Sequence, residues 1–169
     1  PYSARRYLVT QAERRFFHAL RTAVGERYLI ALKVRLADVI SCSGEKWRSG
    51  YGGAISQKHL DFVLVTPETL RIILCIELDD RSHERLDRQK RDAFVDDALH
   101  GARVPLVRIR AARVYDPSRI RGAVIGAVLH PAVSRVSTAR PLRARRAFRS
   151  HAPATFPSPL QRLTPRTRN

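Results

Sequence analysis

The chain has 169 residues, enough for one domain with its own apolar core and an appendage. Its 32 Lys and Arg residues outnumber 15 Asp and Glu residues, and the net charge of +17 favours an anionic partner, either nucleic acid or an acidic membrane surface. No stretch is long and apolar enough to span a membrane, and the two cysteines, Cys42 and Cys75, are too few to form a structural zinc site alone.

The cysteine content and the lack of a membrane span favour a cytoplasmic protein with two free thiols, and a disulfide between Cys42 and Cys75 is the alternative. Arginine makes up 28 of the 32 basic residues, a bias that a GC-rich bacterial genome would produce without selection for arginine contacts. Because the chain begins at Pro1 without a methionine, an upstream targeting signal or anchor stays open. Nothing in the sequence predicts a small-molecule cofactor or membrane association of this chain.

Helical and strand patterns alternate along the first 130 residues. Thr10-Gln11-Ala12-Glu13 has the form of a capping box, and the apolar residues after it recur at helical spacing up to Gly25. Three strands are then predicted, over residues 28–34, 59–65 and 70–78. A glycine-rich loop over residues 42–57 separates the first two strands, and a tight turn joins the second to the third.

The second half of the body continues with a helix over residues 85–100 and a strand over residues 104–109. Asp116-Pro117 then begins a last helix that reaches residue 129, with the aspartate as its cap. The order α-β-β-β-α-β-α predicts an α/β fold, a mixed sheet flanked by helices, over residues 1–130.

Residues 131–169 differ in composition, with nine arginines, no acidic residue and six of the ten prolines. Such a segment cannot bury enough surface to offset the entropy lost on ordering, so a disordered basic tail is predicted. The tail is either an inert solvated extension or an arm that binds phosphates without sequence preference.

Three carboxylates on the second and third predicted strands indicate a site. Asp61 lies on the second strand, and Glu77 and Asp79, two residues apart on the third, share one face. An acid at the end of an apolar strand is costly to bury without a compensating charge, and carboxylate oxygens favour a hard cation such as Mg²⁺. The trio therefore predicts a divalent-metal site. The alternative is that Asp79 begins a turn and Glu77 pairs with an arginine.

Four segments together resemble the DUF2726 family: Asp61–Leu64, Ile76–His83, Arg91-Asp92 and Pro105–Ile109. The resemblance extends to the PD-(D/E)XK, or restriction-endonuclease-like, nuclease superfamily. The pattern of an acid, a second acid two residues later, a histidine and a later arginine is also similar to that of very-short-patch-repair endonucleases. The resemblance covers roughly residues 2–115, including the block Glu13–Phe17.

The resemblance implies a restriction-endonuclease-like core of αβββαβ order and metal-dependent hydrolysis of phosphodiester bonds, with DNA as the expected substrate. It assigns Mg²⁺ or Mn²⁺ to Asp61, Glu77 and the backbone carbonyl of Leu78, and the metal would position an attacking water. Asp79 stands where the superfamily usually has a lysine. It is therefore either a further metal ligand, or the missing positive charge is supplied from elsewhere. The candidates for that charge, and for contacts to nucleic acid, are Lys58, Arg88 and Arg91.

Three further residues are interpreted beside this site. His83 would suit a general base or a phosphate contact, or it is an ordinary residue at the start of a helix. Glu13 is either an additional metal ligand from the first helix or the partner of Thr10 in the capping box. Arg108 on the fourth predicted strand is expected to approach the acidic site and contact nucleic acid.

The glycine-rich loop over residues 42–57 contains basic and aromatic residues, namely Lys46, Trp47, Arg48 and Tyr51. Such residues can contact phosphates and stack on bases, although a mobile loop without a ligand fits equally well. Three functions thus compete. The first is a nuclease that uses Asp61, Glu77, Asp79 and His83, the second a non-catalytic nucleic-acid-binding domain with a degenerate site, and the third an interaction domain for a protein or membrane.

Overall fold

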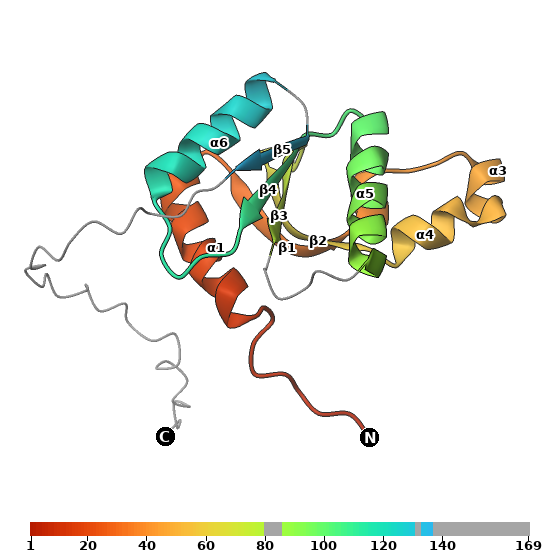
Figure 1. The fold of residues 1–169 in the computed structure, drawn as a ribbon, viewed down its shortest axis with the longest axis horizontal. Coiled ribbons are helices and arrows are strands. Elements are labelled where there is room, and N and C mark those ends of the chain that lie inside the picture. Colours follow the sequence, from red (N-terminus) through yellow and green to blue (C-terminus); the bar gives the residue numbers. More distant parts are fainter. Residues whose placement is uncertain (80–85, 131–132, 137–169) are drawn as a thin grey trace, which may run out of the picture.

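The centre of the protein is a mixed sheet with helices on both faces (Figure 1). The computed structural model describes residues 1–79, 86–130 and 133–136, and for residues 86–92 and 133–136 the description is confined to the backbone. Over these residues the sheet has five strands in the order β1-β2-β3-β4-β5. The prediction of an α/β fold with a mixed sheet flanked by helices is confirmed.

The first helix, α1 (Gln11–Val24), begins at the predicted capping box. The Oγ1 atom of Thr10 accepts a hydrogen bond from the Glu13 backbone at 3.3 Å, and Glu13 Oε2 accepts one from the Thr10 backbone at 2.7 Å. These two bonds satisfy backbone groups that have no partner inside the helix. The helix ends at Gly25, whose φ of 58° lies in the left-handed region that favours glycine.

The strands begin as an antiparallel meander. β1 (Leu29–Arg35) pairs with β2 (His59–Val65), and β2 pairs with β3 (Ile72–Asp79). β4 (Leu106–Arg110) then joins β3 in parallel, after the crossing helix α5 (Leu86–Gly101). The first four strands and both helices follow the predicted αβββαβ order.

A short strand, β5 (Val133–Val136), was not predicted. It follows α6 (Pro117–Leu129) and pairs in parallel with β4, with Leu106 opposite Val133. Four residues are too few to show a strand period, and what orders them is the edge of β4, which offers backbone groups for pairing. The sheet thus extends into the segment predicted as a tail, whose residues 137–169 lie outside the described part of the chain.

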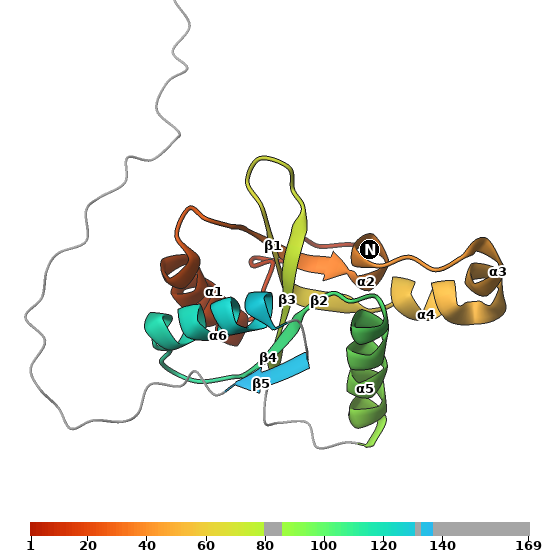
Figure 2. The same ribbon diagram turned by 90° about the horizontal axis from the view of Figure 1, so that it is seen from above.

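The segment between β1 and β2 was predicted as a loop, and that prediction is wrong. After α2 (Leu36–Val39), the chain forms α3 (Gly44–Lys46), the π-helical turn η1 (Trp47–Tyr51) and α4 (Gly52–Ser56). Figures 1 and 2 show these turns projecting from the body of the protein. Residues 43–57 are called the arm below.

Two cores cover the two faces of the sheet (Figure 2). One core lies between the sheet and the helices α1 and α6. Its largest buried members are Phe16, Leu20, Phe62, Leu64, Leu74, Ile76, Ile109 and Ile120. The other core lies between the sheet and the helices α2, α4 and α5. Its buried members are Leu36, Ile55, Leu60, Val63, Cys75, Val95, Leu99 and Leu106.

Two predictions drawn from composition can be checked within these residues. None of the described helices is long and apolar enough to cross a membrane. Cys42 and Cys75 are both free, as predicted, and Cys75 is fully buried in the second core.

Candidate functional site

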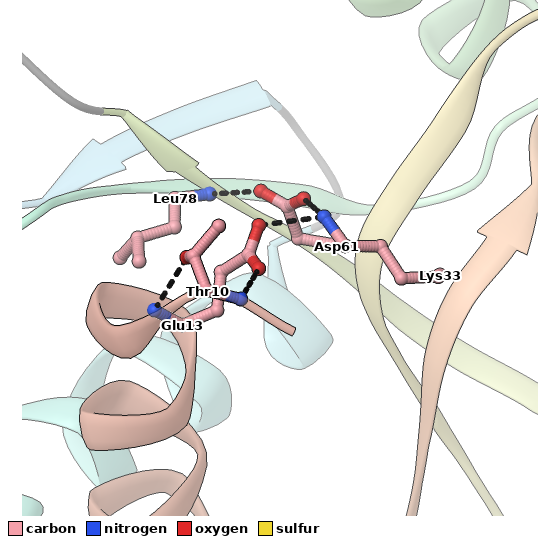
Figure 3. Close-up of polar contacts among 5 residues, drawn as sticks. All are labelled: Thr10, Glu13, Lys33, Asp61 and Leu78. Carbon is pink, nitrogen blue, oxygen red and sulfur yellow. Dashed lines mark hydrogen bonds and ion pairs between the residues drawn. The ribbon is translucent and has the colours of Figure 1, made fainter. Parts of the chain in front are cut away.

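A lysine that the sequence analysis did not single out lies at the centre of the site. Lys33 on β1 extends its ammonium group between two carboxylates, with Nζ 2.6 Å from Glu13 Oε1 and 2.7 Å from Asp61 Oδ1 (Figure 3). Glu13 comes from α1 and Asp61 from β2, so three elements meet at one positive charge. These three side chains are called the Lys33 cluster.

Asp61 also connects the Lys33 cluster to β3. Its second oxygen, Oδ2, accepts a hydrogen bond of 3.0 Å from the backbone N–H of Leu78 (Figure 3). At the Asp61 end of β2, the last backbone pair with β3 joins Phe62 to Ile76. The Asp61 carboxylate therefore connects β2 to β3 beyond the end of their backbone pairing. The side chain of Asp61 is therefore fixed at both oxygens.

The backbone of Lys33 is unusual for a strand. Its φ is 54°, in the left-handed region, although the cross-strand pairs on either side, Leu32 with Phe62 and Val34 with Leu60, keep one register. Leu32 packs in the first core and Val34 in the second, whereas an unbroken strand would place both on one face. A non-glycine residue in this region costs about 1–2 kcal/mol, and such strain recurs at functional sites.

The charges of the Lys33 cluster stabilise one another. Burial alone would raise the pKa of Glu13, but hydrogen bonds from Lys33 and Thr10 outweigh it, so the pKa is lowered. Burial would likewise lower the pKa of Lys33, but its hydrogen bonds to Asp61 and Glu13 raise it. With all three groups ionised, two carboxylates and one ammonium leave the cluster with one net negative charge.

Asp79 belongs to a different ion-pair group, centred on Arg108. The guanidinium of Arg108 lies 3.0 Å from Asp79 Oδ1 and 2.8 Å from Asp96 Oδ1, and the side chain is only 2% exposed. It therefore connects β3, β4 and α5 within the structure. The prediction that Arg108 contacts nucleic acid is not supported, because a buried guanidinium between two carboxylates is not presented to a phosphate.

Glu77 lies between the two groups in sequence and near the second in space. It is half-buried at the end of β3, level with Arg108 in the parallel register of β3 and β4. Burial first, and then the Glu77 carboxylate, raise the pKa of the Cys75 thiol to about 12, so the charge of Glu77 acts on the side of the sheet that faces α5.

The three predicted carboxylates are therefore not gathered at one point. In the part of the chain that the structure describes, no group of three or more His, Cys, Asp or Glu side chains could hold a metal ion. The reason is the two cations: Lys33 holds Asp61 beside Glu13, and Arg108 holds Asp79 beside Asp96.

The remaining predicted residues are only partly described. His83 lies outside the described residues, and Arg88 and Arg91 lie on α5, where the description covers the backbone alone. Lys58 is half-buried directly before β2, and its carbonyl accepts a hydrogen bond of 2.8 Å from the Leu36 backbone.

A signal for Lys33 was present in the sequence. It is the one charged residue in the apolar run Tyr28–Val34, and in an antiparallel pair it falls opposite Asp61. Glu13 had been interpreted as either a metal ligand or a capping-box partner. In the structure, Glu13 Oε2 accepts the capping hydrogen bond from the Thr10 backbone, and Glu13 Oε1 accepts a hydrogen bond from Lys33.

Comparison with known families identifies one relationship. The sequence model of the family described as a protein of unknown function, DUF2726, matches residues 5–128, a range that contains both ion-pair groups and the arm. Comparisons with curated proteins and with solved structures gave no match. Since the family match takes in well over half of the 169 residues, the chain belongs to the DUF2726 family.

Proposed function

We propose that this protein is a metal-dependent nuclease of the PD-(D/E)XK superfamily that hydrolyses phosphodiester bonds in nucleic acid, with DNA as the first candidate substrate. The observation that carries the proposal is the position of Lys33. In the proposal, its ammonium group, held between Glu13 and Asp61 beside the backbone of β3, would supply the positive charge that Asp79 cannot supply from the usual lysine position.

The chemistry of the donors suits a divalent cation, although the described residues do not gather three carboxylates at one point. Glu13 and Asp61 are carboxylate oxygen donors that already enclose the positive charge of Lys33. In the proposal, Glu77 and the Leu78 carbonyl at the end of β3 would add to them the further hard oxygen ligands that Mg²⁺ or Mn²⁺ prefers. A bound ion would supply an activated water and neutralise charge that develops on the phosphate.

The side chains of the chain itself have separate parts in this proposal. Lys33, charged at neutral pH, would orient the attacking water and balance charge on the scissile phosphate. Asp79, held by Arg108, would keep the end of β3 in place rather than bind metal. His83 remains the proposed general base, and Lys58, Arg88 and Arg91 the proposed phosphate contacts. We place the activity in the bacterial cytoplasm, where two free thiols would persist.

The test compares the wild-type chain with Asp61→Asn and Glu77→Gln on plasmid and single-stranded DNA, with Mg²⁺, Mn²⁺ or EDTA. Both variants are expected to lose cleavage by about 100-fold or more. Glu68→Gln is the matched control, since Glu68 is exposed in the turn at the opposite end of β2 and β3 from Asp61. Cleavage that is equal in all four proteins would overturn the site assignment.

Metal binding has a readout that does not need activity. Mn²⁺ or Mg²⁺ is expected to raise the melting temperature of the wild type and of Glu68→Gln, but not of Asp61→Asn, because only a folded site binds the ion. An equal rise in all three proteins would place the ion elsewhere.

A non-catalytic nucleic-acid-binding domain is the second candidate function. It is favoured by the engagement of both Asp61 oxygens and by the lack of a three-carboxylate group among the described residues. It predicts DNA binding that weakens steeply with salt, without cleavage in any metal. An interaction domain for protein or membrane predicts no such salt-dependent binding.

A further inference from the structure

The arm presents aromatic side chains to solvent without burying them in either core. Trp47 is 45% exposed and Tyr51 is 59% exposed, and both belong to the turn η1. Large exposed aromatics on a small projecting element are typical of a binding surface. A ligand of the arm must therefore match the face of an indole ring, a phenol group and the neighbouring positive charges.

The indole of Trp47 is held in a fixed position. A Cβ atom added to Gly52 would lie 2.3 Å from Trp47 Cδ2, so one side of the ring rests directly on the backbone of α4. Gly50, with φ of 100°, gives the change of chain direction that brings α4 under the ring. The ring is thus supported on one side and partly open to solvent.

Basic residues accompany these aromatic residues along the arm. Lys46 and Arg48 flank Trp47 in sequence, and Arg48 Nε donates to the Gly44 carbonyl at 3.2 Å, which keeps its guanidinium beside the arm. Lys58 follows at the base of the arm, and Glu45 is the arm's single acid. A cationic aromatic surface complements a ligand that combines π-faces with negative charge, which describes unpaired nucleotides.

The arm is inserted between β1 and β2, the two strands that carry Lys33 and Asp61. The last β1–β2 pair before this insertion is Arg35 with His59, and α2 with residues 40–42 lies between β1 and the arm. This pair is two residues past Lys33 and Asp61, a distance of about 7 Å along the strands.

We propose that the arm stacks Trp47 and Tyr51 on unpaired bases, and that the substrate is single-stranded nucleic acid or a duplex with an unpaired region. This proposal rests on the proposed function only for the choice of nucleic acid as partner. Binding by the arm needs no cleavage, so the two proposals can fail separately.

The chain contains one tryptophan, so tryptophan fluorescence, excited at a wavelength that the five tyrosines do not absorb, reports on the arm alone. The full chain is titrated in EDTA with oligothymidylate, with an abasic oligonucleotide of equal length, and with a duplex. Stacking predicts strong quenching by oligothymidylate, and little by the abasic strand or the duplex at equal phosphate concentration. Equal quenching by the thymidylate and abasic strands would mean phosphate contact alone and overturn the proposal. Equal quenching by the duplex would overturn the choice of unpaired bases.

Two adjacent glycines provide a matched pair of variants. Gly52→Ala adds a methyl group that must displace the Trp47 ring, while a Cβ at Gly53 meets nothing within 4 Å. Gly52→Ala is expected to weaken oligothymidylate binding about tenfold, and Gly53→Ala to leave it unchanged. Equal affinities for the two variants would refute the role of the Trp47 ring.

Tyr51→Ala keeps the tryptophan reporter and tests the surface if Gly52→Ala does not fold. It is expected to weaken binding severalfold, and an unchanged affinity would exclude Tyr51 from the proposed surface. If the variants change self-association of the chain instead of oligonucleotide binding, the arm is a protein interface and the proposal fails. Cleavage that is intact without base-dependent quenching would leave the nuclease proposal standing and refute this one.

Discussion

Replacement of Lys33 tests the charge and the backbone of the site separately. Lys33→Ala removes two charge-assisted hydrogen bonds, each worth about 1.5–3 kcal/mol when well buried. Because the side chain is 32% exposed, solvent screens part of this, and we expect a loss of about 2–3 kcal/mol in the free energy of unfolding. The alanine also leaves Glu13 and Asp61 facing each other without the cation between them, which adds to the loss.

Lys33→Gly removes the same charge but suits the backbone. At an ordinary strand position glycine is less stable than alanine by about 0.5–1 kcal/mol. At φ of 54° the order reverses, and we expect Lys33→Gly to be more stable than Lys33→Ala by about 1 kcal/mol. Urea denaturation followed by far-ultraviolet circular dichroism measures both variants. An alanine variant that is as stable as the glycine variant, or more so, would refute the left-handed backbone at this residue.

The remaining predictions concern pH, the buried arginine and the thiols. The pKa of Glu13 is lowered and that of Lys33 is raised, so the difference in the free energy of unfolding between wild type and Lys33→Ala should be constant from about pH 5 to pH 10. The difference should shrink below this range as Glu13 is protonated, and above it as Lys33 is deprotonated. A maximum at either extreme in a series of urea denaturations would contradict this expectation. Arg108→Met should lower the free energy of unfolding by about 3–5 kcal/mol, because the carboxylates of Asp79 and Asp96 lose their buried partner. Arg110→Met, at an exposed position, should change it by less than about 0.5 kcal/mol in the same assay. In the native protein at pH 8, one thiol should react with a thiol reagent and the second, Cys75, only after unfolding, since burial raises its pKa to about 12; two fast thiols would be inconsistent with the packing of β3.

The fold could be predicted from sequence because its signals are local. The capping box at Thr10 and the cap at Asp116 mark helix starts, and the apolar run ending at Leu78 marks a strand covered on both faces. β5 and the helical turns of the arm were missed because neither depends on a local pattern. β5 forms by pairing with the edge of β4, and the turns of the arm depend on contacts such as that of Trp47 with Gly52.

The site was harder to predict because strand alternation was assumed to be unbroken. The spacing of two residues predicts that Glu77 and Asp79 share one face of β3. The structure agrees with this prediction, since the Glu77 carboxylate raises the pKa of Cys75 and Asp79 forms an ion pair with Arg108 on β4. The alternation is interrupted at Lys33, where the backbone turns left-handed, and this interruption brings Asp61 to the side of α1. Nothing in the sequence marks a positive φ at a lysine.

A lysine placed at the position of Asp79 tests the proposal that Lys33 on β1 supplies the catalytic charge. Arg108 lies 3.0 Å from the Asp79 carboxylate, so an ammonium group there would face a buried guanidinium. At about 4 Å two like charges repel by about 4 kcal/mol with an effective dielectric constant near 20, although the half-exposed position lets a lysine turn toward solvent. We expect Asp79→Lys to be less stable than Asp79→Asn, and Asp79→Lys combined with Lys33→Ala to stay inactive on DNA. Cleavage restored in the double variant would show that the catalytic charge can also be supplied from β3, and that Lys33 on β1 is not required to supply it.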